Sequence, residues 1–397
     1  MTHAQTRFLY LNLGHFLDHL FMLIFASVAA LRLTSEWGMS YAELVPYATP
    51  GFIAFGVGAI AAGWLADKWS REGMIVIFFI GIGFSAIFAG FASTPVEMSV
   101  ALTLIGIFAA IYHPVGLSMV VEGLQRTGVP IAINGIFGNM GVACAALFTG
   151  LLVDRVGWQS AFYIPGIASI TLGLLYWRFH FQSVSQEAET KNSAKPVAIP
   201  LSQKTIEKNT LLMVFGVIFF TTAVGGLIFQ STTFALPKVL DERLSDFAGS
   251  ASLVGWYTFL VFALAAFAQL VVGFLVDRYP VRLVFSVVAL SQGVLFLVMM
   301  GLEGVSALIV AFAFMLAVFG QIPINDVLVG RMAKSEWRSR AYAVRYLVTF
   351  SVMASSVPLI AWIHSIWGFD RLFLLLAVAG FIIFIATLLL PRDTSAI

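Results

Sequence analysis

Twelve apolar segments, each about as long as a membrane-spanning helix, run through this chain of 397 residues. A bilayer has a hydrocarbon core roughly 30 Å thick, which a helix of about 20 residues crosses. Charged residues make up only 11% of the chain, whereas soluble domains have about 25%. The protein is therefore predicted to be an all-α membrane protein. The segments lie at 8–31, 44–66, 74–93, 97–121, 130–153, 157–179, 210–236, 248–275, 282–301, 304–328, 340–363 and 368–390.

Lysine and arginine residues fall mainly on one side of this predicted topology. With both termini in the cytoplasm, 16 of the 22 basic residues lie in cytoplasmic segments, 5 lie on the opposite side, and Arg345 lies inside a span. Cytoplasmic loops of membrane proteins carry such an excess of positive charge. We therefore expect an integral multi-pass protein of the cytoplasmic (inner) membrane, with both termini in the cytoplasm.

The chain divides into two similar halves. A polar stretch at 182–209 has no helical apolar period and is predicted to be a cytoplasmic linker between six-helix bundles at 1–181 and 210–397. Three features recur in the second half at an offset of 209 to 211 residues. They are Gly63-Trp64-Leu65-Ala66-Asp67-Lys68 with Gly273-Phe274-Leu275-Val276-Asp277-Arg278, Pro114 with Pro323, and Gly157-Trp158 with Gly368-Phe369. Duplicated halves are typical of secondary transporters.

The repeated loop after spans two and eight combines a glycine, an acidic residue and basic residues. Gly63 permits close approach of a neighbouring helix. Arg71 follows Asp67 by four residues and can pair with it or bind a helix C-terminus. In the second copy, the last basic residue is shifted by one position to Arg282. The alternative is an ordinary cytoplasmic loop with solvated charges.

Twelve spans, a central linker and this duplicated loop make the chain resemble transporters of the major facilitator superfamily over essentially its whole length. The resemblance implies two pseudo-symmetric bundles that alternate access to a central cavity. It also implies that the loop residues form a latch, closing the cytoplasmic side when the carrier faces outward. These latch residues are Gly63, Asp67, Arg71, Gly273, Asp277, Arg278 and Arg282. Gly14-His15-Phe16-Leu17-Asp18-His19 and Tyr112-His113-Pro114 are similar to sequences of fosmidomycin-resistance-like drug exporters.

Span one contains three ionisable residues at membrane depth. His15, Asp18 and His19 are spaced i, i+3, i+4, which places them on one helix face. A single central Asp costs about 2.5 to 3.5 kcal/mol to insert, so a function is expected. Asp18 is our candidate proton carrier, modulated by the two histidines, which titrate near neutral pH. The alternatives are a structural pair with His19 or Arg345, direct contact with substrate, or a metal site. The metal site would comprise His15, Asp18, His19, His113 and Met22.

The resemblance implies that spans one, four, seven and ten line the cavity. Their other polar residues are candidate substrate contacts, namely His113 beside Pro114, Gln230 to Thr233, Gln321, Asn325 and Asp326. Arg345 in span eleven either snorkels to the headgroups or faces inward, where it would bind an anionic substrate or pair with Asp326. Asn134 and Asn139 in span five lie five residues apart on different helix faces. Both are expected to hydrogen-bond between helices rather than to bind substrate.

These observations predict a secondary transporter and not an enzyme. The chain contains no Gly-x-x-x-x-Gly-Lys-Ser/Thr loop, which argues against ATP-driven transport. We expect proton-coupled export of a small organic solute by antiport, with alternating access. The alternative is proton-coupled uptake by symport of a nutrient, a metal ion or a metal chelate. The expected partners are the small-molecule substrate, protons and the lipid bilayer. No cofactor and no nucleic acid are expected, and the protein is expected to be a monomer.

Overall fold

The structure is a computed structural model that describes residues 2–122, 128–187, 208–332 and 338–391, and within these ranges it is helical with no strands. Eleven helical stretches in these ranges are long and apolar enough to cross a membrane. The last of them, Leu347–Thr387, is 41 residues long. It breaks at Gly368, where φ is 70° and ψ is −172°, a conformation that favours glycine. This stretch therefore supplies two spans, and the prediction of twelve spans is confirmed.

The first half contains six spans built from nine α-helices, two π-helical turns and one 3-10 turn. Its elements are α1 (His3–Val28), a π-helical turn (Ala29–Leu33), α2 (Thr34–Trp37), α3 (Tyr41–Leu44), a 3-10 turn (Val45–Ala48), α4 (Thr49–Lys68), α5 (Arg71–Gly90), α6 (Pro95–Ala109), a second π-helical turn (Tyr112–Gly116), α7 (Leu117–Val120), α8 (Gly128–Arg155) and α9 (Ser160–Glu187). Pro114 lies in the second π-helical turn. Proline has no backbone N–H to donate, and the helix widens to a π-helical turn around it.

The second half has longer helices. Its elements are α10 (Lys208–Arg243), α11 (Ala251–Ala266), α12 (Ala268–Arg278), α13 (Val281–Met299), α14 (Gly304–Met332) and α15 (Arg338–Thr387). Helix α9 continues to Glu187, beyond the predicted end of the first bundle at residue 181. The rest of the predicted linker, residues 188–207, lies outside the described residues.

Helices begin where side chains satisfy their first backbone donors. Ser70 accepts a hydrogen bond from the Gly73 amide at the start of α5, and Ser250 accepts one from the Leu253 amide at the start of α11. Such caps replace partners that the first turn of a helix lacks. Within the bilayer the helices satisfy their remaining backbone groups internally, which explains why an apolar chain of this kind folds into helices.

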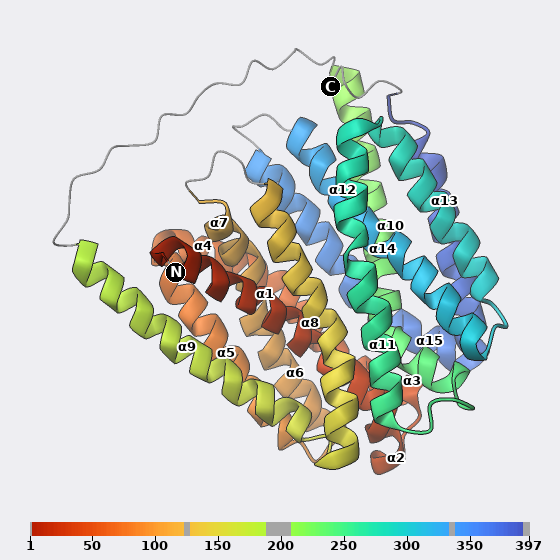
Figure 1. Cartoon of the computed structure of the whole chain (residues 1–397), viewed down its shortest axis with the longest axis horizontal. Coiled ribbons are helices and arrows are strands. Elements are labelled where there is room, and N and C mark those ends of the chain that lie inside the picture. Colours follow the sequence, from red (N-terminus) through yellow and green to blue (C-terminus); the bar gives the residue numbers. More distant parts are fainter. Residues whose placement is uncertain (1, 123–127, 188–207, 333–337, 392–397) are drawn as a thin grey trace.

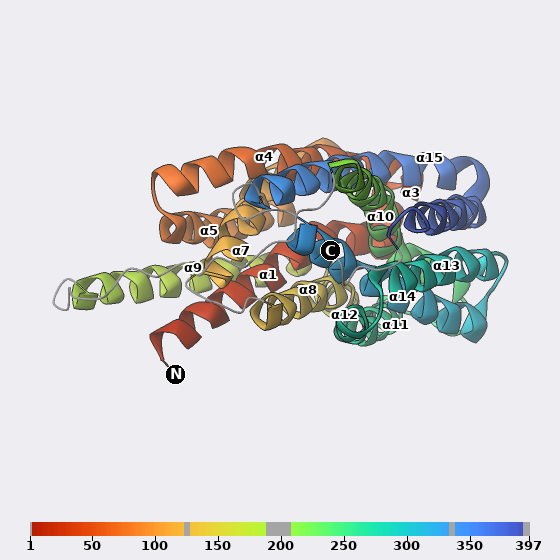
Figure 2. The same ribbon diagram turned by 90° about the horizontal axis from the view of Figure 1, so that it is seen from above.

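The two halves lie side by side as two groups of helices (Figures 1 and 2). Within the first half α1 packs on α8 and α5 on α9, and within the second half α10 and α13 pack on α15. Helices α8 and α11 make the most extensive contact between the halves, followed by α4 with α15. We call the end of the bundle where α1 begins and α15 finishes the terminal end, and the other the opposite end.

At the opposite end the two halves are in close contact. The Ser252 amide of α11 donates a hydrogen bond of 2.7 Å to Asp154 Oδ2 at the end of α8. A Cβ atom on Gly150 would lie 2.2 Å from the Ala251 carbonyl oxygen, so these two helices approach closely only because this residue is glycine. The ring of Tyr41 lies 5.4 Å from that of His364 on α15. The opposite end is thus joined across the halves.

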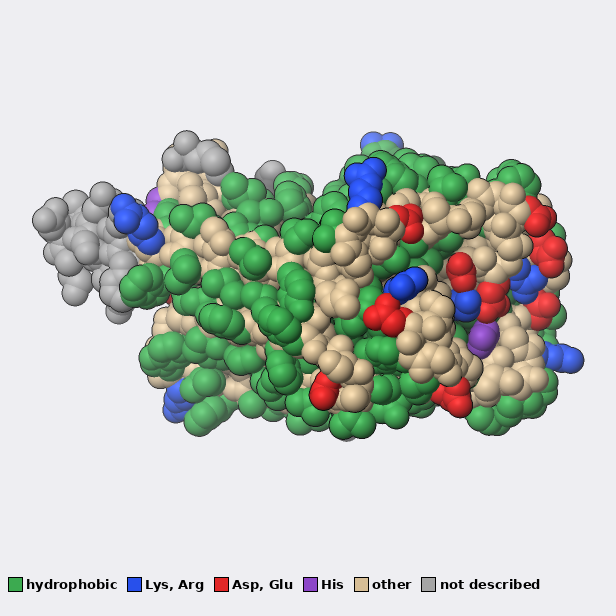
Figure 3. Space-filling view, turned by 90° about the horizontal axis from the view of Figure 1, so that it is seen from below, with side chains coloured by type: hydrophobic (Ala, Val, Ile, Leu, Met, Phe, Trp, Pro, Cys, Tyr) green, Lys and Arg blue, Asp and Glu red, His purple; other side chains and the backbone are tan. Residues whose placement is uncertain are grey.

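The surface is consistent with a membrane environment. In the view from below, hydrophobic side chains cover most of the visible face, and charged side chains gather toward the right (Figure 3). Large apolar side chains such as Trp64, Phe84 and Ile309 are at least 60% exposed. An apolar surface of this extent is too large for a soluble monomer and fits contact with lipid.

Candidate transport site

A buried polar cluster joins α1, the π-helical turn before α7, and α8 inside the first half. We call it the histidine cluster. Its members are Asn12, His15, Asp18, His19, Tyr112, His113 and Asn134. The predicted stripe of span one supplies its α1 side, and the turn that Pro114 produces directs Tyr112 and His113 toward that stripe.

Asn134 fixes the cluster to its scaffold. Its side-chain Nδ2 donates to Asn12 Oδ1 and to the Tyr112 hydroxyl, both at 2.9 Å. The Tyr112 hydroxyl in turn donates to the Leu11 carbonyl at 2.6 Å. The predicted role of Asn134 in bonding between helices is confirmed. Our sequence reasoning missed Asn12 and Tyr112 as members, although Asn12 precedes His15 by three residues and therefore lies on the same face.

His15 is held in one orientation. Its Nδ1 lies 2.8 Å from the Asn134 carbonyl oxygen, which can only accept, so Nδ1 carries the hydrogen. Its Nε2 lies 3.1 Å from His19 Nε2. When both rings are neutral, His19 is the donor in this contact. A Cβ atom on Gly138 would lie 2.7 Å from His15 Nε2, so the imidazole fits because α8 has glycine at this position.

Asp18 is the one acid of the histidine cluster, and its side chain is only 1% exposed. Its Oδ2 lies 3.3 Å from His113 Nε2, and neither oxygen accepts a hydrogen bond from another described residue. The neighbour of Asp18 is therefore His113 from another span, not His19 or Arg345 as the structural alternative supposed. A carboxylate beside an imidazole in an apolar interior can share one proton between two sites.

The histidine cluster also has the donor set of a metal site. The ring nitrogens of His15, His19 and His113 all lie within 4.8 Å of one another. Late first-row divalent metals favour imidazole ligands, so these three residues are the ones that would hold such an ion. In the described geometry, however, His15 bonds His19 directly and His113 faces Asp18. The Nε2 atoms of the three histidines therefore already have protein partners.

The second half contains a corresponding polar group, which we call the arginine cluster: Thr221, Asn325, Asp326 and Arg345. Arg345 Nη1 forms an ion pair with Asp326 Oδ1, and the Thr221 hydroxyl donates to Asn325 Oδ1 at 3.2 Å. Arg345 is only 8% exposed. The interpretation that it snorkels to the headgroups is therefore wrong, because its charge is neutralised inside the bundle by the carboxylate of α14.

Gln230 and Gln321 have different surroundings in the second half. Gln321 accepts a hydrogen bond of 2.7 Å from Gln292 Nε2 and so bonds between helices. Gln230 is 1% exposed, and its Nε2 has no hydrogen-bond partner among the described residues. An unpaired buried amide is costly, so Gln230 remains a candidate substrate contact.

Aromatic rings connect the histidine cluster to α15 across the interface between the halves. Phe55 of α4 and Phe350 of α15 lie 4.6 Å apart between ring centroids. The His113 ring lies 5.5 Å from Phe350 and 5.8 Å from Phe55. His113 therefore contacts Asp18 on one side and this aromatic pair on the other.

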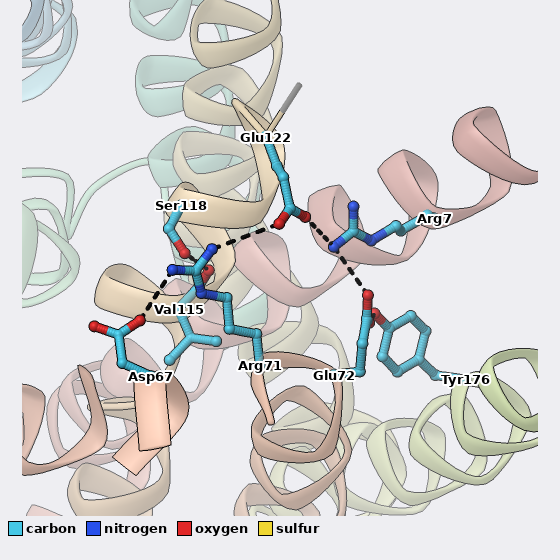
Figure 4. Close-up of polar contacts among 8 residues, drawn as sticks. All are labelled: Arg7, Asp67, Arg71, Glu72, Val115, Ser118, Glu122 and Tyr176. Atoms are coloured by element: carbon cyan, nitrogen blue, oxygen red, sulfur yellow. Dashed lines mark hydrogen bonds and ion pairs between the residues drawn. The ribbon is translucent and has the colours of Figure 1, made fainter. Parts of the chain in front are cut away.

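The first copy of the repeated loop forms an ion-pair network at the terminal end (Figure 4). Arg71 contacts Asp67 at 2.9 Å and Glu122 at 3.5 Å. Arg7 contacts the same Glu122 at 2.7 Å and Glu72 at 2.9 Å. Sequence reasoning predicted the Asp67–Arg71 pair but missed Glu122, an acid at the terminal end of the fourth span, where basic residues predominate.

The network is extended by packing and by one more hydrogen bond. The Tyr176 hydroxyl of α9 donates to Glu72 (Figure 4). A Cβ atom on Gly63 would lie 3.3 Å from Pro114 Cβ, so this glycine lets α4 lie close to the turn that carries His113. The first copy thus joins α1, α4, α5, α7 and α9 at one end of the first half.

The second copy of the loop is built differently. The Arg278 guanidinium lies 4.0 Å from the centroid of the Phe274 ring. Arg282 donates to the Leu390 carbonyl at 3.1 Å, near the C-terminal end of α15. The helix dipole favours a cation at this end. A Cβ atom on Gly273 would meet nothing within 4 Å. The shifted position of Arg282 therefore corresponds to a different partner from that of Arg71.

Twelve spans in two similar halves, with polar clusters buried in each, define a membrane transport protein. The family model described as Major Facilitator Superfamily matches residues 11–245 and 234–397. The chain therefore belongs to the Major Facilitator Superfamily and is a transporter rather than an enzyme. Its relatives in this superfamily include a protein named as a gallate transporter and one named as an export protein.

Two relatives and one solved structure show what kinds of protein this chain is similar to. The gallate transporter of Pseudomonas putida is 26% identical over 176 residues, covering 44% of this chain and 39% of the relative. The tetracenomycin C resistance and export protein of Streptomyces glaucescens is 28% identical over 137 residues, covering 33% of this chain and 26% of the relative. A bacterial homolog of the human lysosomal transporter Spinster, in an inward-facing and unoccupied conformation, has a TM-score of 0.74 at 15% identity, covering 98% of both chains. This last likeness shows the fold.

Proposed function

We propose that this protein is a proton-coupled secondary transporter that exports a small organic solute by antiport. It would act as a monomer in the cytoplasmic membrane, with its terminal end facing the cytoplasm. The observation that carries the proposal is the contact between the buried carboxylate of Asp18 and the imidazole of His113 at 3.3 Å. Ionisable groups at membrane depth are expensive and mark proton pathways in transporters.

In this proposal Asp18 is the proton carrier and the histidines modulate it. His113 offers the neighbouring site, and His15 with His19 forms a second pair of titratable groups on the same helix face. The hydrogen bond from His15 Nδ1 to the Asn134 carbonyl keeps this pair oriented.

Alternating access would follow from rocking of the two halves about the interface that carries Phe55 and Phe350. The Asp67–Arg71–Glu122 network would hold the terminal end of the first half together and act as its part of the latch. The second copy would contribute through Gly273, Asp277, Arg278 and Arg282. In this proposal, the contact between Asp154 and Ser252 would close the opposite end while the carrier is open toward the terminal end.

The rival proposal is uptake by symport. The likeness to an export protein supports antiport, whereas the gallate transporter is named without a direction. Reconstituted vesicles separate the two by the sign of coupling. In antiport an acidic lumen drives solute inward, whereas in symport an acidic exterior does so. Radiolabelled gallate and tetracenomycin C are the first probes, because each compound appears in the name of a relative.

The residue assignment is tested with Asp18→Asn in the full-length protein. We expect this variant to lose solute movement driven by a pH gradient and to retain exchange of labelled for unlabelled solute. Asp246→Asn, which changes an exposed acid, is the matched control and should behave as the wild type. Intact gradient-driven flux in Asp18→Asn would show that the coupling assignment is wrong.

The metal alternative has its own readout. Zn²⁺ that binds only the folded protein would raise its melting temperature in detergent. If His19→Gln abolished such a shift, the cluster would be a metal site and the proton assignment would have to be withdrawn.

A further inference from the structure

The two halves meet along two seams on opposite sides of the bundle. Helices α8 and α11 form one seam, and α4 and α15 form the other (Figure 2). In the first seam the backbones approach closely, because a Cβ atom on Gly255 would lie 2.6 Å from the Ala146 carbonyl oxygen. The second seam contains the rings of Phe55 and Phe350, whose centroids lie 4.6 Å apart. The second seam is therefore closed in part by aromatic side chains.

The two seams occupy equivalent places in the repeat. Arg345 of α15 follows Asn134 of α8 by 211 residues, an offset that also relates the repeated motifs. Phe350 follows Asn139 by the same number of residues. The first half thus has a small amide at the position where the second half has the ring of Phe350. The repeated scaffold does not require a phenyl ring at this position, so the ring of Phe350 calls for an explanation from its surroundings.

Phe350 lies nearer the opposite end of the bundle than the turn that carries His113. Helix α4 runs from the opposite end to the terminal end. A Cβ atom on Gly56 would lie 3.0 Å from Phe350 Cβ, whereas one on Gly63 would lie 3.3 Å from Pro114 Cβ. Seven residues, or about 10 Å of helix, separate these two glycines. The ring of Phe350 nevertheless lies 5.5 Å from that of His113, so it extends toward the imidazole from the opposite-end side.

His113 is the more accessible member of the pair that it forms with Asp18. The Asp18 side chain is 1% exposed and the His113 side chain is 12% exposed, so the accessible atoms of the pair belong mainly to the imidazole. The rings of His15 and His19 cover this imidazole from α1, with centroids at 5.2 and 5.6 Å. Phe350 covers it from the second half. A path for protons between Asp18 and the opposite end therefore leads past Phe350.

We propose that Phe350 is a proton gate, which keeps the His113–Asp18 pair closed to the opposite end while the carrier is open toward the terminal end. This inference rests on the proposed transport function and assigns the residue that controls access to its proton site. Phe350 moves with the second half, whereas Phe55 and His113 move with the first. Rocking that opens the opposite end therefore withdraws the Phe350 ring from the imidazole. Until then, the apolar ring excludes the water through which a proton would leave.

Proton leak in the absence of solute tests the gate. The full-length protein is reconstituted in vesicles that contain a pH-sensitive dye, with K⁺ and valinomycin present to prevent an opposing membrane potential. Removing the ring admits water beside the imidazole, so we expect Phe350→Ala to dissipate a pH gradient at least about fivefold faster than the wild type. Phe350→Leu fills part of the same space and should give an intermediate rate. A wild-type rate in every Phe350 variant that reconstitutes would overturn the proposal.

Phe234→Ala is the matched control, because it removes a similarly buried ring from another contact between the halves. Phe234 of α10 packs on Phe52 of α4 with centroids 5.9 Å apart. We expect this variant to leak at the wild-type rate. A leak as fast as that of Phe350→Ala would show that any cavity between the halves conducts protons, and would overturn the assignment of Phe350.

The double variant Asp18→Asn with Phe350→Ala identifies the path of the leak. An amide does not carry a proton at this pH, so the double variant should return to the wild-type rate. A leak that persists without Asp18 would overturn the proposal, because the path would then bypass the pair that Phe350 is proposed to close.

These outcomes are separable from those of the proposed function. A leak in Phe350→Ala that requires Asp18, together with intact gradient-driven solute flux in Asp18→Asn, would support the gate and refute the coupling assignment. Loss of gradient-driven flux in Asp18→Asn without any leak in the Phe350 variants would support the coupling and refute the gate.

Discussion

The histidine cluster of the first half and the arginine cluster of the second half occupy equivalent positions but use different chemistry. The first is assembled from neutral amides, a phenol and imidazoles around one acid, whereas the second contains a buried ion pair. In the first half, charge can appear or disappear by protonation. In the second half, the arginine charge is permanent, because a guanidinium is not deprotonated in proteins.

This difference separates two tasks on one duplicated scaffold. A site that titrates suits proton transfer, and a site of fixed charge suits recognition of an anion. The two loop copies also differ, because Arg71 pairs with acids whereas Arg282 binds a backbone carbonyl. Duplication supplies the positions, and divergence of a few polar residues within them supplies the chemistry.

The largest effect on stability is expected from Arg345→Ala. Removing one member of a buried pair leaves the other charge unsatisfied, which costs about 3 kcal/mol, the low end for such pairs, because Asp326 is partly exposed. Reversible unfolding in SDS measures the loss. The double variant with Asp326→Ala should recover part of it. A loss below about 1 kcal/mol would show that the pair behaves as a surface ion pair and that the contrast between the clusters is not energetic.

A smaller effect is expected from Asn134→Ala. The substitution removes two hydrogen bonds of 2.9 Å and leaves the carbonyl of Asn12 and the hydroxyl of Tyr112 without this partner. We expect a loss of about 2 kcal/mol in the same unfolding assay. Ser85→Ala is the control, because Ser85 bonds only to Gly81 of its own helix. If the two variants lose equal stability, Asn134 is not the residue that holds the histidine cluster.

Gly138→Ala should disturb the histidine cluster more gently. The added methyl group would lie 2.7 Å from His15 Nε2 and must push the imidazole away from His19. Overpacking of this kind costs about 1 kcal/mol or slightly more. The matched control is Gly216→Ala on α10, where a Cβ atom meets nothing within 4 Å and helix propensity improves. Comparable melting temperatures for the two variants would contradict the predicted contact.

The smallest effect on stability is expected from Glu122→Gln at the terminal end. Its ion pairs with Arg7 and Arg71 are half exposed, so the loss should stay under about 1 kcal/mol and should shrink further in high salt. If the network is a latch, the variant should instead shift the balance of conformations. Crosslinking rates across the terminal end measure that shift. Asp277→Asn tests whether the second copy responds in the same way, and an unchanged crosslinking rate in both would argue for a solvated loop.

Hydropathy, charge placement and the repeat offset were sufficient to predict the number of spans, the fold class and the family, because the bilayer leaves a chain this apolar few alternatives. They also identified His15, Asp18 and His19, because the free-energy cost of placing ionisable side chains inside the bilayer can be inferred from the sequence alone. The pairing of Asp67 with Arg71 followed from their spacing of four residues on adjoining helices.

Partners from distant parts of the chain had to come from the tertiary structure. His113 is the neighbour of Asp18 only because the Pro114 turn rotates it toward α1, and Gly138 leaves space for His15 only because α1 and α8 approach closely. The long charged side chain of Arg345 would allow it to snorkel to the headgroups, but the packing of the helices leaves it only 8% exposed. Helical spacing fixes which residues share a face, whereas the packing of one helix on another decides what that face meets.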